Sequence, residues 1–142
     1  MKAFRTIFAA LAAFALLALQ PAQAQGAADR AEIAAAISGQ LDAFRADDAS
    51  RAYGFAAPVI QRMFPDEGSF MAMVRQGYPP VYRARSHSFG ELRPEGSGFA
   101  QEVFIRDGTG EEWIAVYSLE RQEDGRWLIS GCRLTRRPGL SV

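Results

Sequence analysis

The chain is poor in the residues that metal sites, disulfide frameworks and nucleic-acid surfaces require. Its 142 residues include one cysteine and one histidine, so an internal disulfide is impossible and a zinc site lacks nitrogen and sulfur ligands. Sixteen basic residues balance sixteen acidic ones with the signs interspersed, which makes nucleic acid and a membrane surface poor partners. Neither a cofactor motif nor a G-x-S-x-G elbow occurs, so we expect no cofactor, no metal and no hydrolase nucleophile of that type.

The first 24 residues have the pattern of a secretory signal peptide. Lys2 and Arg5 precede an apolar run over 7–19, which is too short to span a bilayer comfortably, and the small-x-small triplet Ala22-Gln23-Ala24 follows. We therefore predict cleavage after Ala24 and a periplasmic or secreted protein without membrane contact. An uncleaved anchor is the alternative, whereas no cysteine near the cleavage point supports a lipoprotein.

The predicted mature chain, residues 25–142, has the length of one ordinary domain. It keeps 118 of the 142 residues, and all 14 of its basic residues are arginines against 16 acidic ones. The net charge is therefore about −2, and we expect a single domain without internal repeats.

Helical spacing dominates the first part of this domain. Asp29, with Glu32 three residues later, can cap a helix that continues to Ala46. Its apolar residues recur every three or four positions, which predicts one buried stripe: Ile33, Ile37, Leu41 and Phe44. Gly39 in the middle of this helix is unfavourable by roughly 1 kcal/mol relative to alanine, so we expect close packing there.

Three shorter helices are predicted after this one. The first covers about 49–56, Pro58 opens the second, and Asp66 or Ser69 caps the third, which Gly77 ends. The segment 78–82 contains two prolines and is predicted to be extended and rigid, forming a hinge between a helical half and a sheet half.

Four strand candidates make up the second half of the domain. They cover about 85–93, 99–106, 112–122 and 126–134, and short turns separate them. Short turns favour consecutive antiparallel neighbours, hence a four-stranded meander. Helices followed by a meander indicate an α+β fold in which the N-terminal helices pack on a curved sheet and leave a conical cavity.

Asp124-Gly125 is a strong signal for a hairpin between the last two strands. A two-residue loop places Glu123 opposite Arg126, Tyr117 opposite Cys132 and Leu119 opposite Ser130. One face of the hairpin then carries Trp113, Ala115, Tyr117, Leu119, Arg121, Leu128, Ser130, Cys132 and Leu134. The other face carries Ile114, Val116, Ser118, Glu120, Trp127, Ile129, Gly131 and Arg133.

Three blocks occur in order along the chain: LDAFRADDASRAYGFAAPVIQRMF, FMAMVRQGYPPVYRARSHSFGE and QEVFIRDGTGEEWIAVYSLERQEDGRWLISGCRL. Together they resemble the bacterial family DUF4864, a domain of unknown function. The resemblance implies a cone-shaped NTF2-like (SnoaL-like) α+β fold but no known activity. Related folds include isomerases, dehydratases and modules that only bind or dimerise, so the fold does not decide among these functions.

Few residues of the chain could carry chemistry. Asp47-Asp48 is either a carboxylate pair with a raised pKa or two helix caps, and Asp48 is the candidate base. His87, the second candidate, shares a strand face with Phe89 and is alternatively an exposed strand histidine. Cys132 lies in an apolar strand pattern, which predicts a buried, inert thiol. The glycine-rich 108–110 segment is predicted to be a turn, because no helix follows it to form a phosphate loop.

The best candidate for binding is a set of aromatic residues and one arginine: Tyr78, Tyr82, Trp113, Tyr117 and Arg121. Aromatic rings offer apolar area with a polar tip, and an arginine can clamp an anion, although core packing explains the same residues. We expect any site between the fourth helix, segment 78–82 and the strand face bearing Tyr117 and Arg121, with a small acidic or apolar ligand. An internal carboxylate would make the arginine structural, the candidates being Asp47, Asp48 and Glu91.

Two classes of function remain open from the sequence. We favour a non-catalytic periplasmic module that binds a small molecule or a protein partner. In one version of this hypothesis the module forms a homodimer through the outer face of its sheet. The alternative is a small isomerase or dehydratase that uses Asp48 or His87 as general base. The module is favoured because no acid–base pair is recognisable from spacing.

Overall fold

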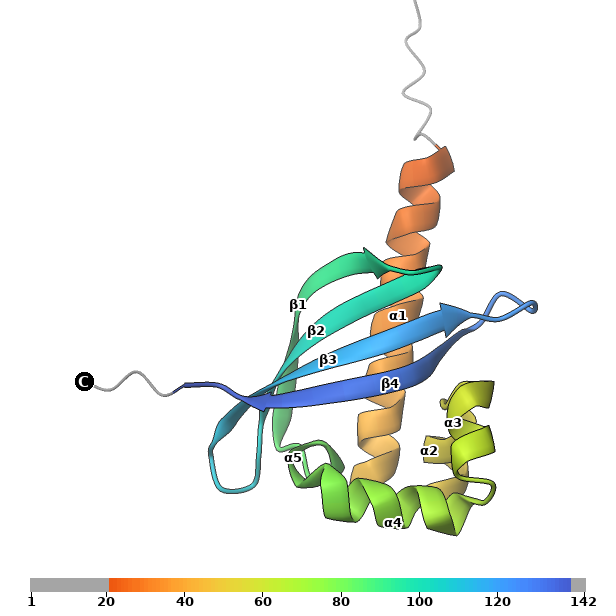
Figure 1. Ribbon diagram of the computed structural model, residues 1–142. Helices are drawn as coiled ribbons and strands as arrows, with labels where there is room; N and C mark the ends of the chain where they lie inside the picture. The colour runs from red at the N-terminus through yellow and green to blue at the C-terminus, as the bar shows by residue number, and fades with distance from the viewer. Residues whose placement is uncertain (1–20, 139–142) are drawn as a thin grey trace, which may run out of the picture.

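A layer of helices covers one face of a four-stranded antiparallel sheet in the computed structural model, which describes residues 21–138 (Figure 1). The helices are α1 (Pro21–Arg45), α2 (Ala49–Gly54), α3 (Pro58–Met63), α4 (Glu67–Gly77) and α5 (Pro79–Tyr82). The strands are β1 (Ser86–Glu95), β2 (Gly98–Arg106), β3 (Glu112–Arg121) and β4 (Trp127–Arg136), in the order β1-β2-β3-β4. The predicted α+β class and the four-stranded meander are therefore confirmed.

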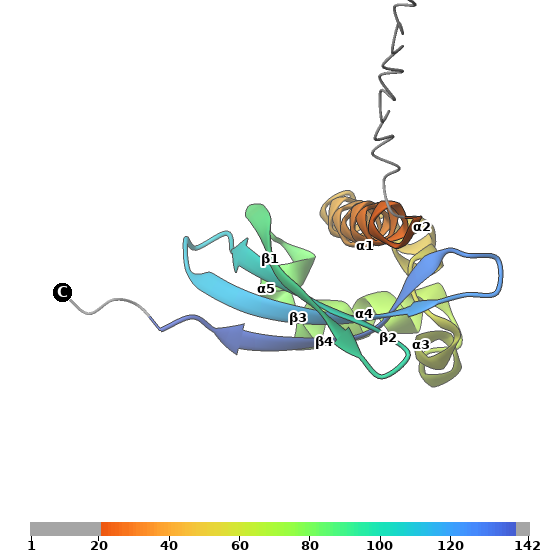
Figure 2. The same ribbon diagram turned by 90° about the horizontal axis from the view of Figure 1, so that it is seen from above.

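The long helix α1 packs against the covered face of the sheet, steeply inclined to the strands, and supplies one side of the core (Figures 1 and 2). Its predicted stripe is confirmed, because all four members are buried: Ile33, Ile37, Leu41 and Phe44. The close packing expected at Gly39 is also present, since a Cβ there would lie 2.5 Å from the Cζ atom of Phe55. Glycine at this position lets the Phe55 ring contact the helix backbone.

The start of α1 differs from the prediction. The helix already includes Pro21, so Asp29 lies well inside it and is not its cap. Asp29 is instead buried and accepts a hydrogen bond from the indole nitrogen of Trp127 at 3.2 Å. The two residues are 98 positions apart, so local sequence patterns cannot predict this contact. The predicted apolar run 7–19 lies outside the described residues. Within residues 21–138, no helix has the length and apolarity needed to cross a membrane.

The short helices begin and end close to where capping chemistry predicts. Asp48 caps α2 by accepting from the Arg51 backbone nitrogen at 3.0 Å, and Asp66 caps α4 by accepting from that of Ser69 at 2.8 Å. The prediction that 78–82 is extended is wrong, because Pro79–Tyr82 forms the one-turn helix α5. Proline suits the first turn of a helix, where its missing N–H leaves no bond unmade.

The β3–β4 hairpin has a longer loop than predicted. Gln122 donates its backbone N–H to the carbonyl of Arg126 at 2.8 Å, and Gly125 donates to Gln122 at 2.9 Å, so residues 123–125 form the loop. Gly125 has φ 88°, the left-handed conformation that ends a type I turn in three-residue hairpins. The predicted pairing of Glu123 with Arg126 is therefore wrong.

A bulge in β4 then changes which residues face the helices. Tyr117 lies opposite Cys132 as predicted, but Leu119 lies opposite Ile129 and not Ser130. The three-residue loop shifts the pairing of 127–129 by one residue, which places Ile129 and Trp127 with Leu119 on the covered face, and the bulge restores the predicted pairing from Gly131 onward. The predicted face assignment of 127–130 is therefore wrong. Backbone hydrogen bonds along the other edge of β4 stabilise the bulged arrangement. There the Ile129 N–H donates to the carbonyl of Phe55 at 2.8 Å, and the Ile129 carbonyl accepts from the N–H of Ala57 at 2.7 Å.

Candidate functional site

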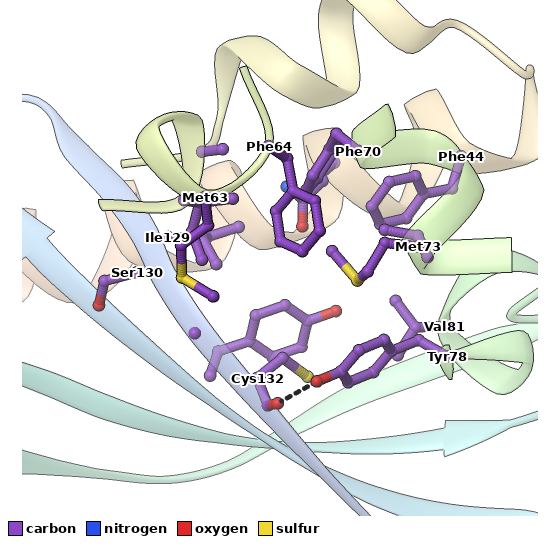
Figure 3. Close-up of a pocket in the computed structure, with 16 residues that line it drawn as sticks. Phe44, Met63, Phe64, Phe70, Met73, Tyr78, Val81, Ile129, Ser130 and Cys132 are labelled. Atoms are coloured by element: carbon purple, nitrogen blue, oxygen red, sulfur yellow. Dashed lines mark hydrogen bonds between the residues drawn. The ribbon is translucent and has the colours of Figure 1, made fainter. Parts of the chain in front are cut away.

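A pocket of about 390 Å³ opens between the helical layer and β4 (Figure 3). Its walls are mainly aromatic, aliphatic and methionine side chains from α1, α3, α4 and the sheet, including Phe44, Ile60, Met63, Phe64, Phe70 and Met73. The side of the sheet is formed by Tyr117, Ile129 and the residues up to Cys132. Pockets of this size and apolar lining hold small organic molecules in many proteins.

Helix α3 forms one side of this opening and is fixed at both ends. The Ala57–Ile129 backbone bond holds its start, and the Tyr53 hydroxyl donates to the Phe64 carbonyl at 2.6 Å just beyond its end. Met63, at the last turn, keeps 64% of its surface exposed although it also lines the pocket. An exposed methionine beside an apolar cavity is a flexible contact for a bound molecule.

The polar side chains that line the pocket are few: Gln40, Tyr78, Tyr117 and Ser130 carry amide or hydroxyl groups. Tyr78 donates its hydroxyl to the carbonyl of Cys132 at 3.1 Å, and Gln40 donates its amide to the carbonyl of Ala52 at 3.2 Å. The hydroxyl of Tyr117 is buried and has no hydrogen-bond partner among the described residues. Among those residues, the pocket lining includes no charged side chain.

Burial also shifts the pKa of two titratable groups in the pocket, Tyr117 and Cys132. Desolvation raises the pKa of the Tyr117 phenol well above its usual value and raises the pKa of the Cys132 thiol to about 12. Both groups are therefore neutral near pH 7. Cys132 is partly exposed and lines the pocket, so the prediction that it is simply a buried core residue is wrong.

We predict that the Cys132 thiol reacts slowly in the native protein in spite of its partial exposure. Because only the thiolate is nucleophilic, a pKa of about 12 leaves very little reactive form at pH 8. Alkylation by iodoacetamide at that pH should be at least about 100-fold slower than in denaturant, where the thiol regains an ordinary pKa. Equal rates in native and denatured protein would contradict this assignment.

Tyr82, a predicted binding residue, belongs to a separate exposed cluster. Its hydroxyl donates to Asp47, and the Arg83 guanidinium lies 2.8 Å from the same carboxylate and donates to the Phe44 carbonyl at 2.7 Å. The Tyr82 hydrogen bond, followed by the Arg83 contact, lowers the pKa of Asp47. Asp47 has φ 51°, so this cluster stabilises the left-handed end of α1, and the Asp47 carboxylate does not line the pocket.

The two candidate catalytic residues lie outside the pocket. Asp48 is exposed, and its carboxylate is used as the α2 cap. His87 is half-buried against α1, where its Nε2 lies 3.0 Å from the Ser38 hydroxyl, and it packs edge-on to Phe89 as strand alternation predicted. Burial lowers the pKa of His87. In the described part of the chain, no group of acidic residues, histidine and cysteine could hold a metal ion.

Trp113 is occupied by the β2–β3 turn. Its indole nitrogen donates to Asp107 at 2.9 Å, and the same carboxylate accepts from the Thr109 hydroxyl at 2.6 Å. The Thr109 bond is the main reason that the pKa of Asp107 falls to about 2. The glycine-rich 108–110 segment is therefore a turn organised by Asp107, as predicted.

Arg121 shares a strand face with Tyr117 but lies at the far end, away from the pocket. Its guanidinium is 3.8 Å from the buried Asp29 carboxylate and lies over the Trp127 ring at 5.9 Å. The internal partner is thus Asp29, and the three predicted partners are wrong. Of the five predicted binding residues, the structure brings only Tyr78 and Tyr117 together in the pocket.

Sequence reasoning missed most of the apolar lining. Met63, Phe64 and Met73 were assigned to helices, but their spacing did not show that α3 and α4 face β4 across a cavity. One local signal was available in the sequence. Met63 and Phe64 are adjacent at the end of a short helix, and a helix as short as α3 cannot bury both side chains by itself.

Comparison with known proteins gives a family without an assigned activity. No curated protein and no solved structure shows a significant match to the chain. A family model described as "Domain of unknown function (DUF4864)" matches residues 26–142, which is most of the sequence. The chain therefore belongs to the DUF4864 family.

Proposed function

We propose that this domain is an exported, non-catalytic module that binds a small apolar molecule in the pocket beneath α3. The observation that carries the proposal is the pocket itself, about 390 Å³ of mainly apolar lining with an exposed methionine, Met63, at its mouth. Filling such a cavity removes apolar surface from water, which favours binding by roughly 25 cal/mol for each Å² buried.

The position of the titratable groups supports binding over catalysis. Asp48 and His87 each have a local partner outside the pocket. Two titratable groups of the pocket, Tyr117 and Cys132, are neutral near pH 7 because burial raises the pKa of both. A general base needs a pKa near the working pH and contact with the substrate. An isomerase or dehydratase mechanism therefore has less support here than a binding role.

We further propose that the fold is of the NTF2-like type. Support comes from the single helical layer against one face of an antiparallel sheet and from the pocket between the two (Figures 1 and 3). In this arrangement the ligand would lie between helices and strands and not on the outer sheet face.

Export is proposed from the N-terminal pattern, with cleavage after Ala24. Residues 22–28 are exposed, and the first buried side chain of the described chain is that of Asp29. Cleavage after Ala24 would therefore remove no core contact. An intact mass from periplasmic extract should correspond to a chain starting at Gln25, and a mass that retains residues 1–24 would contradict export with cleavage.

Substituting Met63 with glutamate tests the pocket directly. Met63 is 64% exposed, so M63E should fold normally while placing a charge at the pocket mouth. We expect titration with Nile red, a neutral apolar dye, to show about tenfold weaker binding, equivalent to about 1.4 kcal/mol.

The matched control is Phe89→Glu, because Phe89 is the other exposed large apolar residue in the described chain and does not line the pocket. F89E should bind the dye like the unmodified protein. Equal dye affinity in M63E, or equal losses in both variants, would place the dye elsewhere and reject the pocket as the binding site. Mass spectrometry of organic extracts from natively purified protein then identifies what the pocket carries.

A further inference from the structure

The Tyr117 hydroxyl is an unsatisfied polar group at an otherwise apolar site. Tyr117 is 1% exposed, it lines the pocket, and its hydroxyl has no hydrogen-bond partner among the described residues. Buried polar groups nearly always have a partner, and each exception calls for a physical reason. A phenylalanine would fill the same space without this cost, so the hydroxyl points to a contact made with an occupant of the pocket.

The neighbouring polar groups do not supply that contact. Tyr78 donates its hydroxyl proton to the Cys132 carbonyl at 3.1 Å (Figure 3), and Gln40 donates one amide N–H to the carbonyl of Ala52 at 3.2 Å. The Cys132 thiol lies close enough to the Tyr117 hydroxyl for each group to affect the pKa of the other, but a thiol is only a weak hydrogen-bonding partner. Among the buried polar side-chain atoms of the described residues, only the Tyr117 hydroxyl has no hydrogen-bond partner.

The charge of the lining limits what the occupant can be. The described residues around the pocket carry no charge that could pair with a carboxylate or an ammonium group. Moving an unpaired ion from water into such surroundings is strongly unfavourable. Burial raises the pKa of Tyr117, so the phenol keeps its proton near neutral pH and acts as a hydrogen-bond donor.

We propose that the pocket selects an uncharged, largely apolar molecule with one carbonyl-type oxygen, which accepts a hydrogen bond from the Tyr117 hydroxyl. This inference rests on the proposed function and adds the chemical class of the ligand. A ketone or an ester has the required acceptor, while the rest of such a molecule contacts Phe44, Phe70 and Met73. The hydroxyl then orients the molecule, and the apolar walls supply most of the affinity.

A pair of isosteric probes separates the hydrogen bond from apolar burial. Benzophenone has a carbonyl between two phenyl rings, and the corresponding alkene replaces its oxygen with a CH₂ group of similar size. Competition against Nile red measures both affinities in the unmodified protein and in Tyr117→Phe. Since Y117F removes only an unpaired hydroxyl, it should fold at least as stably as the parent.

We expect Y117F to weaken benzophenone binding by about three- to tenfold, the effect of one net hydrogen bond, and to leave alkene binding within about twofold. Tyr78→Phe is the control, because it removes a pocket hydroxyl that already has a partner and should not favour either probe. Equal changes for ketone and alkene in Y117F would overturn the inference, as would diphenylacetate binding as tightly as benzophenone. If neither neutral probe displaces Nile red from the unmodified protein, the proposed function fails together with this inference.

Discussion

Replacing Gly98 with alanine is expected to lower the free energy of unfolding by about 3 kcal/mol, the upper part of the range for overpacked sites. Gly98 begins β2, and a Cβ atom there would overlap the carbonyl oxygen of Leu119 on β3. Backbone cannot move aside like a flexible side chain, so the β2–β3 ladder would have to separate locally. Urea denaturation followed by circular dichroism measures the change.

The control for this substitution is Gly131→Ala in β4. A Cβ at Gly131 would meet only the Ser118 Cβ, at 4.0 Å, which is an ordinary contact. Its expected effect is within about 0.5 kcal/mol. A G98A protein as stable as G131A would show that β2 and β3 do not approach each other as closely as described here.

Removing the Asp29 carboxylate is expected to cost about 2–3 kcal/mol, because a buried donor loses its partner. Asp29 is buried in α1 and accepts from the indole nitrogen of Trp127 at 3.2 Å. In Asp29→Ala the buried Trp127 N–H would have neither this acceptor nor free access to water. Thermal and urea unfolding of the variant give the size of the loss.

Two further variants identify which contact of Asp29 matters. Asp29→Asn keeps an oxygen for Trp127 and should retain more than half of the lost stability, whereas Arg121→Ala should cost less than about 1 kcal/mol. The Arg121 side chain is 46% exposed, and its guanidinium lies as far as 3.8 Å from the Asp29 carboxylate. Solvent therefore screens this ion pair. If R121A proves as damaging as D29A, the ion pair and not the indole bond holds α1 to the sheet.

Local patterns were sufficient for most helix boundaries and for the order of the strands, but not for the start of α1 or for α5. The buried stripe of α1, the Asp66 cap of α4 and the meander each depend on residues close together in sequence. The β4 bulge could not be predicted in this way, because it depends on backbone bonds between Ile129 and residues 55–57. The facing of 127–129 is therefore reversed relative to the prediction, while the predicted pairing holds again from Gly131 onward.

The candidate site was predictable only in part for a similar reason. Tyr78 and Tyr117 were correctly placed together, since one follows α4 and the other lies on the covered strand face. Tyr82, Trp113 and Arg121 have the same side-chain chemistry, yet each is occupied by a carboxylate: Asp47, Asp107 and Asp29 respectively. Residue type indicates what a side chain can bind, but only the tertiary contacts show whether that capacity is already used.

The most direct test of the account uses the methionine methyl groups as reporters. Met63 and Met73 line the pocket, whereas Met71 lies in the same helix as Met73 but is buried in the core, 1% exposed, and does not line the pocket. Methyl NMR spectra of isotope-labelled protein would be recorded while benzophenone is added to saturation. The account predicts that the Met63 and Met73 signals move and the Met71 signal stays in place. Stationary Met63 and Met73 signals, or a Met71 shift as large as theirs, would contradict binding in this pocket.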